Sequence, residues 1–179
     1  MEEINELMQE RIKKLKQLRE LGIDPYGGVF EVKDRVSDIL EKYENISKEE
    51  LETKNENYTI AGRIIALRSF GKAAFAHVQD ASGKLQIYFK KDVLGKDYDV
   101  LKNLDVGDII GLKGLLFRTK TNELTIEVME FVLLCKSLRP LPEKWHGLRD
   151  VETRYRQRYV DLIVNPHVRE IFLKRSRLI

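Results

Sequence analysis

The feature that most constrains the fold of this chain is an alternation of apolar and polar residues in two neighbouring segments, 71–80 (GKAAFAHVQD) and 84–92 (KLQIYFKKD). A period of two is typical of strands that bury one face, so the segments predict a β-hairpin. Its core side chains would be Ala74, Ala76, Val78, Leu85, Ile87 and Phe89. Phe75, Gln86 and Tyr88 would then lie together on the outer face of a sheet, where two aromatic rings need an explanation.

The segments around this hairpin predict a small barrel. A β-branched run at 59–69 precedes it, and residues 108–123 and 124–138 form a further hairpin around Lys-Thr-Asn-Glu. Residues 96–104 predict a helical or looped link between the third and fourth strands. Five strands with a helix in that place are the order of an OB-fold, a five-stranded Greek-key barrel. Three glycines occupy positions where such a barrel bends: Gly62, Gly111 and Gly114.

Helical patterns flank the barrel, so we expect a mainly β fold with flanking helices. Apolar residues from Ile4 to Leu18 recur at three- and four-residue spacing, and shorter helices are predicted near 37–43 and after Ser47. A proline-rich linker at 139–142 precedes a helical tail. The predicted boundaries are 1–57 for a helical extension, 58–138 for the OB-fold, and 139–179 for the linker and tail.

Charge is distributed unevenly along the chain. Residues 1–57 carry a net charge of −5, residues 58–138 carry +3, and residues 139–179 carry +5. A basic region is compatible with a polyanionic partner, although a charged stretch is often only a solvated surface. Lys13, Lys14 and Lys16 cluster on the first helix, where they could contact a phosphate backbone or simply complement the helix dipole.

Composition and motifs exclude several other classes of protein. No apolar run approaches the roughly 20 residues of a membrane-spanning helix. Cys135 is the only cysteine, so no disulfide can form within the chain. We therefore expect a cytoplasmic protein that does not bind a membrane. The three histidines are scattered without metal-ligand spacing, which predicts no metal site. Asp105 and Asp108 bracket a turn glycine and are interpreted as turn formers. No catalytic motif is recognised.

The outer face of the hairpin is the candidate site, because OB-folds bind ligands across strands two and three. Phe75 and Tyr88 could stack on bases, and the Gln86 amide offers a donor and an acceptor that match the edge of uracil. Arg68 could add a donor, and Glu123 could accept from a base N–H. Each residue alone also has an ordinary structural explanation, such as a core ring, a solvent-facing amide or a turn residue. Only their convergence on one face favours binding.

Several stretches resemble the N-terminal part of bacterial-type class II lysyl-tRNA synthetases. They are residues 11–27 (RIKKLKQLRELGIDPYG), 71–88 (GKAAFAHVQDASGKLQIY), 106–126 and, most specifically, 138–166 (LRPLPEKWHGLRDVETRYRQRYVDLIVNP). The resemblance implies an OB-fold that binds the tRNA anticodon. It implies that Phe75 stacks on the central uridine and that Gln86 reads its edge. The other residues that it assigns to the anticodon site are Arg68, Tyr88 and Glu123.

The resemblance also implies what belongs to the longer enzyme. In that family a C-terminal catalytic domain binds ATP, Mg²⁺ and lysine, and the enzyme is a homodimer. The sequence ends inside what resembles the first catalytic motif, so we expect a fragment that binds tRNA with a uridine-rich lysine anticodon, needs no cofactor and does not activate lysine. Two alternatives stay open: a free-standing OB-fold module that binds single-stranded nucleic acid, and an interaction domain with no nucleic-acid partner.

Overall fold

The computed structural model describes residues 6–54, 56–142, 148 and 150–179. They fall into two compact units, Met1–Arg139 and Pro140–Ile179. The helical segment before the barrel is thus part of the same unit as the barrel. Ile4, the first apolar position of the predicted N-terminal helix, and His146 of the linker motif lie outside the described residues.

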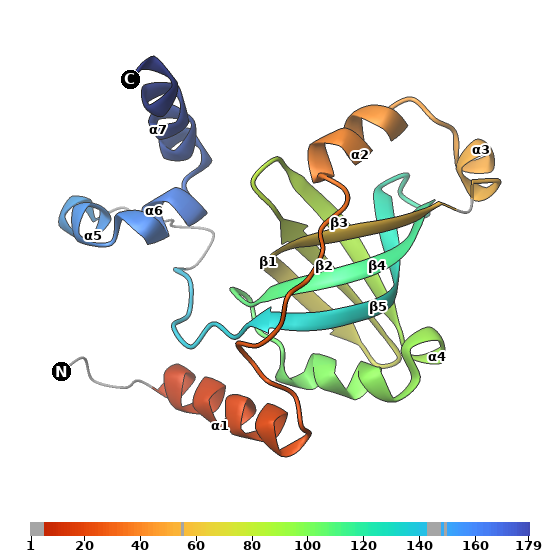
Figure 1. Cartoon of the computed structure of the whole chain (residues 1–179), viewed down its shortest axis with the longest axis horizontal. Helices are drawn as coiled ribbons and strands as arrows, with labels where there is room; N and C mark the ends of the chain where they lie inside the picture. Colours follow the sequence, from red (N-terminus) through yellow and green to blue (C-terminus); the bar gives the residue numbers. More distant parts are fainter. Residues whose placement is uncertain (1–5, 55, 143–147, 149) are drawn as a thin grey trace. The chain divides into compact units, whose positions relative to one another are not determined.

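The first unit is built on a closed five-stranded barrel (Figure 1). Its strands are β1 (Asn57–Phe70), β2 (Ala73–Gln79), β3 (Lys84–Lys90), β4 (Ile109–Arg118) and β5 (Leu124–Cys135). They pair in the order β1-β2-β3-β5-β4 around the barrel, and only β3 and β5 run parallel. Helix α4 (Lys91–Leu94) and the 3-10 helix η1 (Gly95–Asn103) connect β3 to β4. The predicted OB-fold is therefore confirmed.

Alternation in β2 and β3 divides their side chains between the core and the outer face as the sequence indicates. Ala74, Ala76, Val78, Leu85, Ile87 and Phe89 are all buried in the barrel. Phe75 and Tyr88, which come from positions between them, are only half-buried. Phe75 is therefore not a core residue, and the outer face that carries it belongs to the hairpin that the sequence predicts.

Two glycines allow strands to approach more closely than a side chain would permit. A Cβ atom on Gly62 of β1 would lie 2.7 Å from the carbonyl oxygen of Gln79. A Cβ atom on Gly114 of β4 would lie 2.1 Å from the carbonyl oxygen of Glu127, next to a register shift between Lys113 and Gly114. Both positions therefore require glycine because of this close approach, and the register shift beside Gly114 is what a bend of the strand there would produce.

The N-terminal segment wraps around the barrel. Helix α1 (Glu6–Glu20) buries Leu15 and Leu18, and the chain that follows pairs with β1 through hydrogen bonds from the amides of residues 33 and 34 to the Thr59 carbonyl. Helix α2 (Val36–Tyr43) lies at the end of the barrel where β2 turns into β3 (Figure 1). The helix predicted after Ser47 is α3 (Lys48–Glu52), and a capping box begins it, in which the Ser47 hydroxyl accepts from the Glu50 amide.

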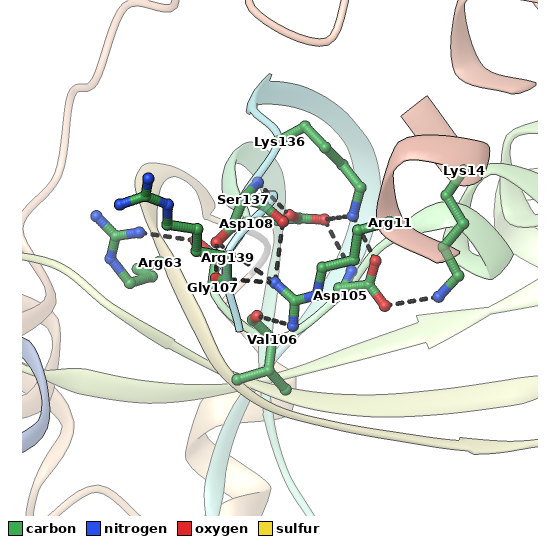
Figure 2. Close-up of polar contacts among 10 residues, drawn as sticks. All are labelled: Arg11, Lys14, Arg63, Asp105, Val106, Gly107, Asp108, Lys136, Ser137 and Arg139. Carbon is green, nitrogen blue, oxygen red and sulfur yellow. Dashed lines mark hydrogen bonds and ion pairs between the residues drawn. The ribbon is translucent and has the colours of Figure 1, made fainter. Parts of the chain in front are cut away.

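A polar cluster fixes α1 to the start of β4 and the end of β5 (Figure 2). The Lys136 ammonium is fully buried and lies 2.8 Å from a carboxylate oxygen of the buried Asp108 and 2.6 Å from one of Asp105. Asp105 also pairs with Lys14 of α1 at 2.6 Å. The predicted turn is present, because the Asp105 amide donates to the Asp108 carboxylate. Asp105 and Asp108 therefore also form ion pairs, which the turn pattern in the sequence did not indicate.

The second unit is helical, as the sequence predicts. It contains α5 (Val151–Arg156), α6 (Arg158–Val164) and α7 (Pro166–Leu178), which begins with proline in its first turn. Asp161 is buried and accepts from Arg154, Arg158 and Asn165. No helix in the described part of the chain is long and apolar enough to cross a membrane.

Candidate nucleic-acid interface

The outer face of β2 and β3 carries a cluster of aromatic rings. Phe75 and Tyr88 lie directly opposite each other in the two strands, with ring centroids 4.6 Å apart and planes inclined by 32°. Phe117 of β4 meets Tyr88 edge-on at 5.9 Å. All three rings are only half-buried, so they form a partly open apolar surface on the outside of the barrel.

A polar group adjoins these rings along the same strands. The Gln86 amide nitrogen donates to the Glu123 carboxylate at 2.7 Å, and the Gln86 amide oxygen accepts from the Thr125 hydroxyl at 2.8 Å. His77, the cross-strand neighbour of Gln86, lies 3.1 Å from the other carboxylate oxygen of Glu123. Four side chains from β2, β3, β5 and the turn before β5 thus form one hydrogen-bonded network.

The turn between β4 and β5 determines where Glu123 lies. Asn122 adopts a left-handed backbone conformation with φ of 63°, which asparagine tolerates better than most residues. The Glu123 amide donates to the Thr119 hydroxyl, and the Thr119 amide donates to the Glu123 carbonyl. This closed turn holds the Glu123 carboxylate over the ends of β2 and β3, where it meets His77 and Gln86.

The turn between β2 and β3 is held by Asp80. Its carboxylate accepts hydrogen bonds from the backbone amides of Ser82, Gly83 and Val36. Burial alone would raise the pKa of Asp80, but these hydrogen bonds hold it below the ordinary value of 3.8. Because Val36 begins α2, the same carboxylate joins this helix to the hairpin that bears the aromatic rings.

The other predicted site residues fall into two groups. Arg68 of β1 is exposed and pairs with Phe75 in the sheet register, and among the described residues its side chain makes no hydrogen bond or ion pair. Lys13 and Lys16 are exposed on α1, whereas the Lys14 ammonium pairs with Asp105. The structure therefore brings Arg68, Phe75, Gln86, Tyr88 and Glu123 together on one face. The three lysines belong to a different surface, that of α1.

Two residues of this face were not singled out from the sequence. Thr125 lies two positions after Glu123 and opposite Gln86 in the sheet register. Phe117 lies between the core residue Leu116 and Arg118, so the alternation that identified Phe75 also places it outward. Both could have been found by continuing the period-two pattern into β4 and β5. Within the described residues, no three His, Cys, Asp or Glu side chains gather as metal ligands would.

Known proteins resemble this chain both over the barrel and over its whole length. Residues 58–134 match the family described as OB-fold nucleic acid binding domain. The chain is 52% identical to a lysine–tRNA ligase of Oceanobacillus iheyensis over 99% of its own length, which is 36% of that ligase. A lysine–tRNA ligase of Bacillus subtilis is 50% identical over the same shares, and one of Carboxydothermus hydrogenoformans is 53% identical, with 35% of it covered. The chain spans about a third of the length of these relatives.

Proposed function

We propose that the chain binds the anticodon loop of a lysine tRNA, because its barrel matches the family described as OB-fold nucleic acid binding domain and the whole chain is similar to about a third of the length of lysine–tRNA ligases. The proposed contact surface is the outer face of β2 and β3 together with the turn between β4 and β5. The observation that carries this proposal is the Phe75–Tyr88 ring pair beside the hydrogen-bonded Gln86 amide.

The ring pair supplies affinity. An unpaired base of an anticodon loop can stack on a half-exposed aromatic ring, which is worth about 1–3 kcal/mol per base. Phe75 is the proposed platform for the central base, and its packing against Tyr88 restrains the ring before RNA arrives. A platform that is already ordered loses little side-chain entropy on binding.

The Gln86 amide supplies base identity in this proposal. A carboxamide has two N–H donors and two acceptor lone pairs, and Glu123 and Thr125 use one of each. One donor and one acceptor remain, which match the O4 acceptor and N3–H donor of uracil. Arg68 is available as a further donor, and Glu123 has lone pairs left for the N–H of a neighbouring base. These contacts would suit a uridine-rich anticodon.

The basic residues of α1 are proposed to contact the RNA backbone. Lys13 and Lys16 are the stronger candidates because their side chains are exposed. Lys14 is bound to Asp105, so its charge is partly neutralised by the protein before RNA binds. Such contacts would contribute affinity that depends on salt and not on sequence.

The relatives are, by name, ligases of lysine to tRNA as whole proteins. In this proposal the ligation, with its ATP and Mg²⁺, belongs to the longer enzyme that the resemblance implies. We assign to the present residues the recognition of tRNA and no step of the ligation. The homodimer expected of the longer enzyme, and its cytoplasmic location, are part of the same proposal.

A binding titration tests the proposed function. The chain is titrated into a fluorescent stem-loop with the anticodon UUU and into a matched stem-loop that differs only in the anticodon. We expect tighter binding of the UUU stem-loop, and we expect Phe75→Ala to reduce that affinity. Equal affinity for both RNAs would favour the alternative of an unspecific single-strand-binding module, and absence of binding to either would contradict both.

A further inference from the structure

The Gln86 carboxamide is held at both of its ends, and the two partners differ in chemistry. Glu123 holds the nitrogen end at 2.7 Å and the Thr125 hydroxyl holds the oxygen end at 2.8 Å. An ionised carboxylate can only accept hydrogen bonds, whereas a hydroxyl can donate or accept. Glu123 therefore tolerates only one of the two orientations of the amide, while Thr125 tolerates both.

The Thr125 hydroxyl has a second acceptor within reach, so it can stay hydrogen-bonded in either orientation of the Gln86 amide. Its oxygen lies 3.1 Å from the Glu123 carbonyl as well as 2.8 Å from the Gln86 amide oxygen. If the amide turned over, Thr125 could accept from the amide nitrogen and donate to that carbonyl. Glu123, by contrast, would then face the amide oxygen, and two acceptors would be placed against each other. The penalty for turning over thus comes from Glu123.

Glu123 is itself fixed from two sides. His77 lies 3.1 Å from its second carboxylate oxygen, and because a carboxylate only accepts, the His77 Nε2 atom carries the proton. The amide of Glu123 is bound by the Thr119 hydroxyl. The carboxylate that orients Gln86 is therefore itself held in position, although Glu123 is an exposed turn residue.

We propose that Glu123 determines the preference for uridine over cytidine by fixing the orientation of the Gln86 amide. The inference rests on the proposed function. Uracil presents an O4 acceptor beside an N3–H donor, whereas cytosine presents an N4 donor beside an N3 acceptor. An amide that could turn over would pair with either edge. With Glu123 in place, only the orientation that matches one of the two bases is available, so Glu123 acts as a positioning residue for Gln86.

Two variants separate orientation from simple contact. Glu123→Gln keeps the size of the side chain but can donate as well as accept, so both orientations of Gln86 become possible. Thr125→Val removes one partner of Gln86 but leaves the carboxylate that fixes it. Affinities are measured for stem-loops with U or C at the central anticodon position and constant flanking bases. We expect roughly tenfold or greater preference for U in the natural chain. Thr125→Val should lose affinity for both RNAs because Gln86 loses one partner, but it should keep most of the preference. In Glu123→Gln we expect the preference to fall to within about threefold of unity.

A structural readout without RNA accompanies the titration. The Gln86 side-chain amide is observed by ¹⁵N NMR, where the hydrogen bond to a carboxylate should shift one amide proton downfield in the natural chain and in Thr125→Val. The shift should be smaller in Glu123→Gln, because a neutral amide oxygen is a weaker acceptor than a carboxylate. A thermal melt of each variant checks that it is folded. The exposure of Glu123 leads us to expect this of Glu123→Gln, and the similar size of valine leads us to expect it at the buried Thr125.

The outcomes distinguish this inference from the proposed function. If the natural chain does not prefer U at the central position, the proposed function fails and the role of Glu123 as a positioning residue fails with it. If the natural chain prefers U and Glu123→Gln keeps that preference, only the role of Glu123 is wrong. A second pair of stem-loops, which differ only at a flanking anticodon base, tests direct reading of that base. A Glu123→Gln variant that loses discrimination there alone would also overturn the role, because Glu123 would then read that base directly.

Discussion

At the scale of single residues, Phe75 separates a binding role from a structural one. Phe75→Ala should weaken binding of the UUU stem-loop by about 1–3 kcal/mol through lost stacking. The fold should persist because the ring lies on the outer face of the barrel. Phe89→Ala is the matched control: its ring is fully buried one position beyond Tyr88, and its loss should cost about 3–5 kcal/mol of stability. A titration and a urea melt on both variants test this, and a Phe75→Ala chain that melts early but binds normally would refute it.

Asp105 gives a pH-dependent prediction. Burial alone would raise the pKa of Asp105, but hydrogen bonds from Lys136 and Lys14 hold it below the ordinary value of 3.8. A carboxyl with a lowered pKa in the folded state stabilises the fold above the unfolded-state pKa, and this contribution is lost as pH falls through the folded-state pKa. Asp105→Asn should therefore be less stable than the natural chain near neutral pH, and the difference should shrink as the solution is acidified.

Urea unfolding of the two chains from about pH 6 to about pH 3 measures that difference. Asp99→Asn is the comparison for an exposed ion pair. The hydrogen bond from Lys102 also lowers the pKa of Asp99, but because both side chains are exposed, solvent screening should leave only a small pH-dependent stability difference. The prediction fails if the stability difference between the natural chain and Asp105→Asn stays constant over this range.

Much of the site follows from residue alternation, but its contacts do not. The outward position of Phe75, Gln86 and Tyr88 follows from a period of two in a strand. The pairing of Gln86 with Thr125 depends instead on a parallel register between β3 and β5, which are separated by α4, η1 and β4. Pairing across such a distance in sequence is set by barrel closure, and no local pattern encodes it. The buried position of Lys136 was unpredictable for the same reason.

At the scale of secondary-structure elements, α1 is attached to the barrel by one arginine as well as by its apolar face. The Arg11 guanidinium donates to the carbonyls of Ser137 at 2.9 Å, Val106 at 3.0 Å and Arg139 at 3.3 Å (Figure 2). Ser137 and Arg139 follow the end of β5, and Val106 lies in the turn before β4. Helical periodicity predicted α1, but it could not show that a polar residue between the apolar positions is the one that docks it.

Arg11→Ala should loosen α1 without unfolding the barrel. Charged hydrogen bonds are worth about 1.5–3 kcal/mol each, although those of one side chain are not additive. Leu15 and Leu18 still bury the helix, so we expect faster hydrogen exchange confined to α1. Arg11→Lys should behave almost the same, because one ammonium cannot replace a fork that spans three carbonyls. Lys13→Ala, on the exposed side of α1, is the control and should leave exchange unchanged.

At the scale of the whole molecule, the two units differ in how much they bury. The first unit contains a continuous apolar core that extends from Leu18 of α1 to Leu133 of β5. In the described part of the second unit, only Val160 and Asp161 are buried. Large apolar side chains of that unit are exposed: Val151, Tyr155, Tyr159, Ile171, Leu173, Leu178 and Ile179. Since the free energy of local unfolding increases with buried apolar contact, the second unit should unfold at a lower free energy than the first.

Hydrogen exchange should therefore divide the chain near Arg139. Amides of β1–β5 should exchange only through global unfolding, whereas amides of α5, α6 and α7 should exchange through smaller openings and show much lower protection. The buried Asp161 cluster should make α6 the slowest of these three helices, because its carboxylate joins Arg154, Arg158 and Asn165. Exchange of the isolated chain is measured at two protein concentrations. Protection in α7 that equals that of the barrel strands at both concentrations would contradict the prediction. Protection that rises with concentration would show instead that its exposed apolar residues associate with a second copy.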